Sequence, residues 1–143
     1  MAETVDTNVL VYASNVDAPE FAIASDVVAS VLRGPQLTTI FWPVVVTYLR
    51  IITHPAILPA PLSAAKAQAN VDALMAAPSV RVVGEGERFW ECYRSVGGGR
   101  GNDVPDAVIA ALMHEHGVGT ILTRDRDFRK YPGITVRDPF ATP

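Results

Sequence analysis

The sequence predicts a three-layer α/β/α domain built around a central parallel sheet. Short β-prone segments alternate with longer helical segments along the chain, which is the pattern of βαβ units. The chain has 143 residues and 49% of them are hydrophobic, which is enough for one hydrophobic core. Neither an internal repeat nor a linker divides it, so we expect residues 1–143 to form a single domain.

The opening segment contains the first expected strand, Thr4–Asp6. Thr7 and Asn8 follow, and their side chains are typical of residues that start a helix. The next apolar stretch, Val9–Ala13, is too short for its periodicity to distinguish a helix from a continuing strand. Both interpretations therefore stay open at this point.

The later elements are bounded by helix-ending residues and separated by short β-prone runs. Gly and Pro punctuate the chain after most helical segments, and the glycine-rich stretch Gly97–Gly101 is the one clear flexible break. Ser63 is expected to cap a helix, and Asp103 or Asn102 another. The expected helices are Pro19–Leu32, Pro43–Thr53, Ala64–Ala77, Glu85–Val96 and 103–116. The expected strands are Thr38–Phe41, Val80–Val83, Thr120–Thr123 and Ile134–Val136.

Composition narrows the class of protein. No apolar run is long enough to span a bilayer, and the acidic N-terminal sequence is unlike a secretory signal. Cys92 is the single cysteine, which excludes an internal disulfide and fits a reducing compartment. We therefore expect a cytoplasmic protein. The net charge of −3 argues against nucleic acid, but residues 119–137 hold five basic residues against two acidic ones, as in an enzyme that binds phosphate.

Several aspartates are expected to meet at one edge of the sheet. Asp6 ends the first strand, Asp125 follows a later strand, and Asp106 lies in the first turn of a helix, three residues after Asp103. Ligands of open α/β sheets bind at the carboxyl ends of the strands. Converging carboxylates repel one another, and Mg²⁺ or Mn²⁺ prefers such oxygen ligands while leaving room for substrate phosphate. An isolated aspartate in these places is more often a helix cap than a ligand, above all Asp103.

Four motifs in order make the sequence resemble the PIN-domain nucleases, and more narrowly the VapC toxins of bacterial toxin–antitoxin pairs. They are Asp6-Thr7-Asn8-Val9-Leu10, Leu49-Arg50-Ile51-Ile52-Thr53-His54-Pro55, Pro105-Asp106-Ala107-Val108-Ile109-Ala110-Ala111 and Thr123-Arg124-Asp125-Arg126-Asp127-Phe128. The likeness covers the chain from Val5 to Phe140. It implies a PIN-like fold, Mg²⁺- or Mn²⁺-dependent endoribonuclease activity, a homodimer, and inhibition by a cognate VapB-type antitoxin.

The resemblance also implies roles for individual residues. By position, the catalytic and metal-binding acids are Asp6, Asp106 and Asp125, with Asp103 as a further metal ligand. Asn8 and Thr123 match supporting polar positions, and Asp127 is a nearby acid that could orient a ligand. The family usually has a glutamate just before the Leu-Arg pair, where this chain has Thr47. A hydroxyl brings no charge, so the resemblance leaves the second metal and the size of the activity in doubt.

Substrate contacts are expected from arginines beside these motifs. They are Arg100 in the glycine-rich stretch and Arg124, Arg126 and Arg129 near the last acid. Aromatic residues such as Trp90 and Tyr93 could stack bases, but at helical positions among apolar neighbours they more often belong to a core or interface.

Three functions follow as hypotheses. The first is a toxin that cleaves an exposed single strand of structured RNA, of the tRNA or rRNA type, by metal-activated water. The second is a catalytically weakened PIN-like module that binds RNA or an antitoxin, marked by the missing acid at Thr47. The third is a phosphatase or phosphoacceptor domain, which is disfavoured because haloacid-dehalogenase-type enzymes need a second aspartate at the position of Asn8.

Overall fold

The computed structural model describes residues 2–142, which form a three-layer α/β/α domain as expected. Within them a five-stranded sheet has the order β3-β2-β1-β4-β5, and every neighbouring pair is parallel. The strands are β1 (Glu3–Val5), β2 (Thr38–Phe41), β3 (Val80–Val83), β4 (Thr120–Leu122) and β5 (Thr135–Arg137). Two of the expected strands, β2 and β3, are confirmed to the residue.

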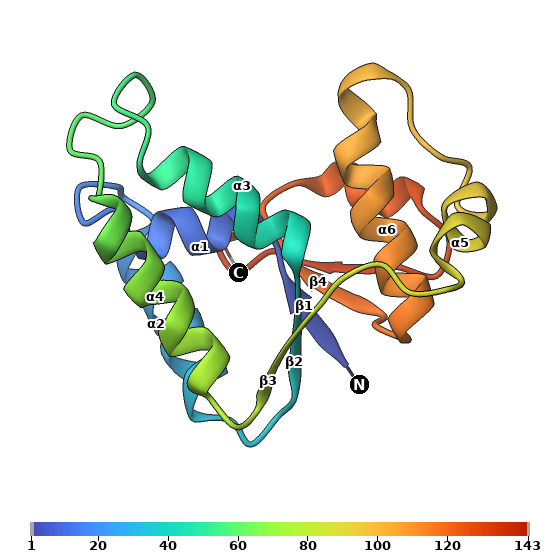
Figure 1. Ribbon diagram of the computed structural model, residues 1–143, viewed down its shortest axis with the longest axis horizontal. Helices are drawn as coiled ribbons and strands as arrows, with labels where there is room; N and C mark the ends of the chain where they lie inside the picture. Colours follow the sequence, from blue (N-terminus) through green and yellow to red (C-terminus); the bar gives the residue numbers. More distant parts are fainter. Residues whose placement is uncertain (1, 143) are drawn as a thin grey trace.

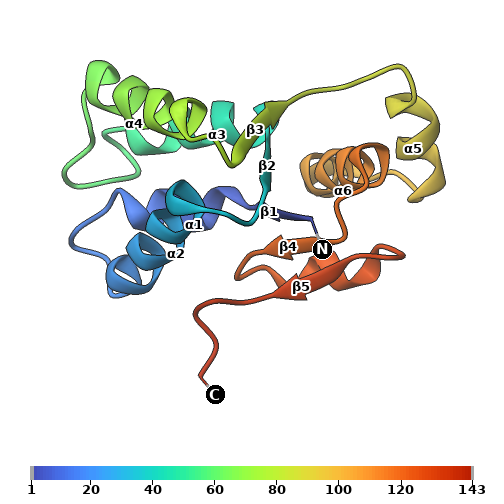
Figure 2. The ribbon, with the colours of Figure 1, turned by 90° about the horizontal axis from the view of Figure 1, so that it is seen from below.

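The helices cover both faces of the sheet. Figure 2 shows α1 to α4 on one side of the strands and α5 and α6 on the other. Their bounds are α1 (Thr7–Ala13), α2 (Phe21–Arg33), α3 (Trp42–Ile52), α4 (Ala64–Ala76), α5 (Phe89–Ser95) and α6 (Val104–His116). Two short 3₁₀ helices, η1 (Gly101–Asp103) and η2 (Arg126–Lys130), were not expected. In the part of the chain that the structure describes, no helix is long and apolar enough to cross a membrane.

The stretch Val9–Ala13, for which the sequence left helix and strand open, is helical. The first strand ends at Val5, one residue earlier than expected, and Asp6 is the N-cap of α1. Its extended backbone (φ −80°, ψ 163°) and its side-chain bond to the Thr7 N–H are typical of a cap. The first strand and the first helix therefore meet at Asp6.

The expected helix Glu85–Val96 begins later than expected, at Phe89. The carboxylate of Glu115, at the end of α6, accepts hydrogen bonds from the N–H groups of Gly86 (2.8 Å) and Arg88 (2.9 Å). These long-range bonds hold residues 86–88 in a non-helical segment against α6. The helical periodicity was therefore correct, but the beginning of the helix depends on a residue far along the chain.

The central strands lie in the hydrophobic core, as parallel strands covered on both faces must. All residues of β2 and β4 are buried, whereas the edge strands β3 and β5 are largely half-buried or exposed. In α6 the core residues run from Ala107 to Met113, apart from the half-buried Val108. Figure 1 shows this helix crossing the sheet with its N-terminal end at the edge where α1 begins. The packing therefore brings the start of α6 toward the carboxyl ends of β1 and β4.

Candidate active site

The site is built on the paired carboxyl ends of β1 and β4. These strands are parallel neighbours in which Val5 lies opposite Leu122. The N–H of Asp6 donates to the Leu122 carbonyl at 3.0 Å, which continues the ladder by one bond beyond β1. The next residues of the two chain segments, Asp6 and Thr123, therefore leave the sheet side by side.

The Asp6 carboxylate is held by three donors. Its Oδ1 accepts from the Thr7 N–H at 2.8 Å, and its Oδ2 accepts from the Thr123 hydroxyl at 2.8 Å and from Asn8 Nδ2 at 3.3 Å. Asn8 Nδ2 also donates to Thr123 Oγ1 at 2.9 Å. The two residues expected to support the acids thus both contact Asp6, and the network fixes the direction of its carboxylate.

Thr123 links Asp6 to Asp125. Its hydroxyl donates to Asp6 and accepts the N–H of Asp125 at 2.9 Å. Asp125 is the N-cap of η2, where its Oδ1 accepts the N–H of Asp127 at 2.9 Å. Asp125 is half-buried at the site, while Asp127 is exposed. Asp127 therefore meets the cluster through its backbone N–H, and the negative charge of its side chain acts on Lys130.

The remaining two acids come from the start of α6. Asp106 lies in the first turn of the helix and is half-buried. Asp103 occupies the N-cap position, but its backbone is helical and its side chain forms no capping bond. The expectation that Asp103 caps the helix through its side chain is therefore wrong. Its carboxylate instead lies 3.5 Å from the Lys130 ammonium, at the end of η2.

The charges of these acids act on one another. Burial raises the pKa of Asp6, and the nearby charge of Asp125 adds to the rise, while the hydrogen bonds from Thr123 and Thr7 oppose it. The pKa of Asp106 is raised to about 6, by burial first and then by the charges of Asp125 and Asp6. The Lys130 ammonium lowers it in part. Three aspartates from three separate elements thus share one electrostatic site.

A cavity of about 510 Å³ opens beside these acids, between the starts of α1, α3 and α6. Asp6, Asn8 and Asp106 line it, and so does Thr47 from α3. The Thr47 hydroxyl donates to the Pro43 carbonyl of its own helix at 2.9 Å. Thr47, where the resemblance implies a glutamate, therefore lines the site cavity, but its polar atom is engaged within α3.

The donor set fits a hard divalent cation, although the carboxylates are not drawn tightly together. Among residues 2–142 there is no group of three or more acidic, histidine or cysteine side chains close enough to form a metal site as they stand. The fit rests on chemistry: the raised pKa values of Asp6 and Asp106 reflect burial and an excess of negative charge. A divalent cation with oxygen ligands relieves this repulsion.

The arginines expected to contact phosphate divide into two groups. Arg124 is engaged within the protein, because its guanidinium pairs with Glu20 and lies over the rings of Tyr12 (5.5 Å) and Phe140 (5.0 Å). The other three are exposed, and within residues 2–142 their side chains form no ion pair or hydrogen bond. They are Arg100, Arg126 and Arg129.

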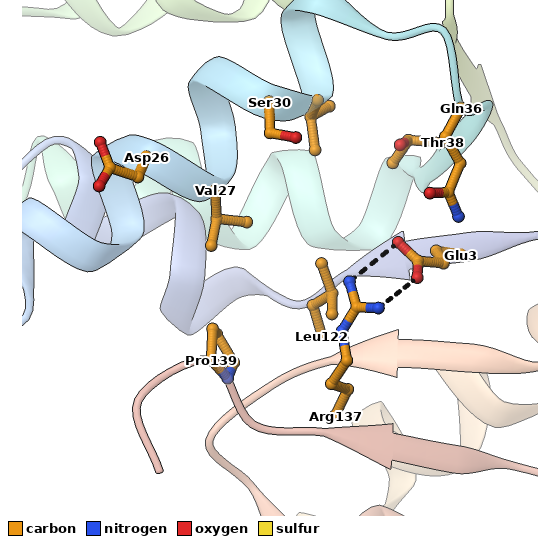
Figure 3. Close-up of a pocket in the computed structure, with 10 residues that line it drawn as sticks. Glu3, Asp26, Val27, Ser30, Gln36, Thr38, Leu122, Arg137 and Pro139 are labelled. Atoms are coloured by element: carbon orange, nitrogen blue, oxygen red, sulfur yellow. Dashed lines mark hydrogen bonds and ion pairs between the residues drawn. The ribbon is translucent and has the colours of Figure 1, made fainter. Parts of the chain in front are cut away.

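Arg137, counted in the basic C-terminal section, is also paired. It contacts Glu3 through both terminal nitrogens, at 2.8 and 3.2 Å. Figure 3 shows this pair in a separate cavity of about 290 Å³, which α2 lines with Asp26 and Ser30. None of the predicted site acids lines this cavity. Three of the five basic residues of the section, Arg124, Lys130 and Arg137, are thus paired with a carboxylate.

Sequence reasoning did not single out Lys130 or the residues that hold Arg124. Lys130 was counted only as one basic residue of the C-terminal section. Its place five residues after Asp125 gives no periodic signal, because the 3₁₀ helix between them was not expected. The partners of Arg124 lie 104 and 112 residues away in the chain, at Glu20 and Tyr12, so no local pattern could identify them.

Comparisons with known proteins show what the chain is similar to. A PIN domain family model matches residues 4–134. The chain is 46% identical over 144 residues to Ribonuclease VapC48 of Mycobacterium tuberculosis (strain ATCC 25618 / H37Rv), and the match covers 99% of each chain. Among solved structures it resembles M. tuberculosis VapC20, a Sarcin-Ricin loop cleaving toxin, with a TM-score of 0.68, 18% identity and coverage of 95% and 99%. It also resembles VapBC2 from Rickettsia felis bound to a DNA fragment from their promoter, with a TM-score of 0.67, 15% identity and coverage of 96% and 98%.

Proposed function

The chain belongs to the PIN-domain family, among the VapC-type ribonuclease toxins, and we propose that it is a Mg²⁺- or Mn²⁺-dependent endoribonuclease. Its substrate is an exposed single strand of a structured cellular RNA, of the tRNA or rRNA type. The observation that carries the proposal is the shared electrostatic site of Asp6, Asp106 and Asp125. The 46% identity to Ribonuclease VapC48 along nearly the whole chain supports the same activity.

The metal would be held by the three aspartates, with Asp103 as a further ligand. When bound, it would supply a water of lowered pKa and would neutralise charge on the substrate phosphate. The protein's own part is to orient the ligands. Asn8 and Thr123 fix the Asp6 carboxylate, and Thr123 ties it to the backbone of Asp125. The raised pKa of Asp106 means that proton and metal compete for this carboxylate.

A second candidate function is a catalytically weakened module that binds RNA or an antitoxin. The observation that favours it is Thr47, which lines the site cavity with an uncharged side chain turned to Pro43. Thr47→Glu would restore the acid, and Val46→Glu adds the same charge to an adjacent residue that is 62% exposed. If the nuclease proposal is right, the wild type cleaves RNA, and cleavage grows about tenfold with Thr47→Glu but not with Val46→Glu. Cleavage that appears only with Thr47→Glu would favour the weakened module.

The proposed partners follow from the family. We propose a VapB-type antitoxin as inhibitor, supported by the likeness to the toxin–antitoxin assembly VapBC2, and a homodimer as the assembled state. The site of action is the cytoplasm, where RNA of these types is found and where the buried Cys92 stays reduced. Light scattering of the purified chain, with and without its antitoxin, tests both assemblies.

The decisive experiment is cleavage of total cellular RNA by the purified chain with Mg²⁺, Mn²⁺ or EDTA. We expect discrete fragments that require the metal and disappear in Asp6→Ala. Asp72→Ala removes a carboxylate from an exposed position of α4 and should cleave like the wild type. Cleavage that persists in EDTA, or in a folded Asp6→Ala variant, would contradict the proposed site.

A further inference from the structure

Lys130 occupies a distinctive place beside the acidic cluster. It is the last residue of η2, which begins directly after Asp125. Its ammonium lies 3.5 Å from Asp103 Oδ1, and its charge acts on Asp106. Among residues 2–142 it is the cation for which an ion pair with one of the site acids is found. Its positive charge is thus held at the edge of the acidic cluster.

The side chain of Lys130 is positioned rather than loose. Its ammonium lies 5.4 Å from the centre of the Tyr131 ring, a cation–π distance. Tyr131 itself is only 4% exposed and packs against Phe128 in the core. One side of Lys130 therefore rests on a rigid aromatic surface, while 46% of the side chain remains exposed. The ammonium can exchange the Asp103 carboxylate for an anion in solvent at little conformational cost.

The same region contains an unsatisfied polar atom. The Tyr131 hydroxyl is buried and has no hydrogen-bond partner among the described residues. Its pKa is raised, by burial first, and it responds to the charges of Lys130, Asp106 and Asp103. The hydroxyl therefore lies in the field of the acidic cluster. A buried hydroxyl without a partner costs free energy in the folded chain.

The charge balance of the site requires a cation of this kind. Asp6, Asp106 and Asp125 repel an RNA phosphate, and a single divalent ion offsets only part of their charge. Arg124, the arginine beside the last acid, is committed to Glu20 and two aromatic rings. An exposed lysine held at 3.5 Å by a carboxylate at the edge of the cluster has the chemistry to take a phosphate instead.

We propose that Lys130 binds a backbone phosphate of the substrate strand, and that the ion pair with Asp103 holds its ammonium in place until RNA arrives. The proposal rests on the proposed ribonuclease function and names a substrate-positioning residue for it. RNA binding exchanges the carboxylate of Asp103 for a phosphate oxygen, so no charge is left unpaired on Lys130. Asp103 would then be free to serve as the further metal ligand.

The chain offers a matched control, because Lys66 and Lys130 are its two lysines. Lys66 lies on α4 and is exposed. Cleavage kinetics on a short single-stranded RNA should show about a tenfold rise in KM for Lys130→Ala with kcat within about twofold, since one phosphate contact is lost. Lys130→Arg should restore KM to within about threefold, and Lys66→Ala should match the wild type. A purely structural role would instead lower kcat and would not be rescued by arginine.

Binding measurements separate the phosphate contact from the ion pair. With RNA binding followed in EDTA and in Ca²⁺ over a range of salt, Lys130→Ala should lower the slope of log K against log[salt] by about 0.7. Asp103→Asn removes the competing carboxylate and should tighten RNA binding in EDTA. If Lys130 served only to hold Asp103, both variants would weaken binding alike, and that result would overturn the proposal.

Lysine footprinting gives a readout that does not depend on activity. Amine modification of the wild-type chain, followed by mass spectrometry, should show Lys130 protected by RNA and Lys66 unchanged. RNA that is bound or cleaved while Lys130 stays as reactive as in the free protein would refute this inference and leave the ribonuclease function intact. Absence of both binding and cleavage in every metal would overturn the ribonuclease function and this inference together.

Discussion

Asp106→Asn should make the metal-free protein more stable while it abolishes activity. The Asp106 carboxylate has a pKa of about 6, raised from its ordinary value of 3.8, so its ionised form is disfavoured in the folded chain. Between these two pH values the folded chain holds more protons than the unfolded chain. The free energy of unfolding therefore falls as pH rises from about 4 through about 6. Above about pH 6 the folded chain carries the full free-energy cost of the ionised Asp106 carboxylate.

The size of the effect follows from the shift. One pKa unit corresponds to about 1.4 kcal/mol, so the upper limit is about 3 kcal/mol. Because Asp106 is only half-buried, solvent screening reduces this to about 1–2 kcal/mol. For a domain of this length we expect the melting temperature of Asp106→Asn to rise by about 3–6 °C at pH 7.5 in EDTA. The rise should disappear below about pH 4, where both states are protonated.

The assay is thermal or urea unfolding of both proteins from pH 4 to pH 8, with Asp72→Asn as an exposed control. Adding Mg²⁺ or Mn²⁺ at pH 7.5 should stabilise the wild type by mass action and Asp106→Asn much less. Equal stability of the two proteins at pH 7.5 in EDTA would refute the electrostatic reasoning. A difference that persists unchanged at pH 4 would show that the amide acts through packing or hydrogen bonding instead.

Three further predictions concern residues around the site. Arg124→Ala should lower the free energy of unfolding by about 0.5–1 kcal/mol through lost ring and ion-pair contacts, with RNA affinity unchanged within about twofold; a large loss of affinity would contradict its internal role. Gly99→Ala places a Cβ 2.7 Å from backbone atoms at the start of α6 and should reduce both stability and cleavage. Gly84→Ala is the control in melting and cleavage assays, because its Cβ makes only an ordinary contact at 3.5 Å. Glu115→Ala removes the acceptor of two backbone N–H groups and should cost about 2 kcal/mol in urea unfolding; an unchanged midpoint would show that these bonds contribute nothing.

The sequence could predict those parts of the fold that depend on local pattern. Strands β2 and β3 match their expected bounds because short β-prone runs are flanked there by residues that end structure. The convergence of Asp6 and Asp125 was also predictable, because the carboxyl ends of neighbouring parallel strands must meet at one edge. No exact contact was needed for that inference. Topology alone brings the two acids together.

What the sequence could not predict depends on contacts between distant segments. The late start of α5 follows from the bonds that Glu115 makes to residues 86–88. Arg124 was expected to contact phosphate, but its guanidinium has a closer partner in Glu20, 104 residues earlier. Asp103 is a residue type that commonly caps helices, but its backbone is helical and its side chain pairs with Lys130 instead. In each case a tertiary contact competes with the local preference.

The uncharged Thr47 in the site cavity has two opposing consequences for the site. A further carboxylate in the same cavity would raise the pKa of Asp106 still more, because like charges add to the penalty. The uncharged Thr47 therefore makes the metal-free site less strained than a four-acid cluster. A threonine also offers no anionic ligand, so the three aspartates would hold a cation with less charge than a four-acid cluster. Metal binding here should consequently depend more strongly on pH near 6, because a single proton on Asp106 removes a larger share of the ligand charge.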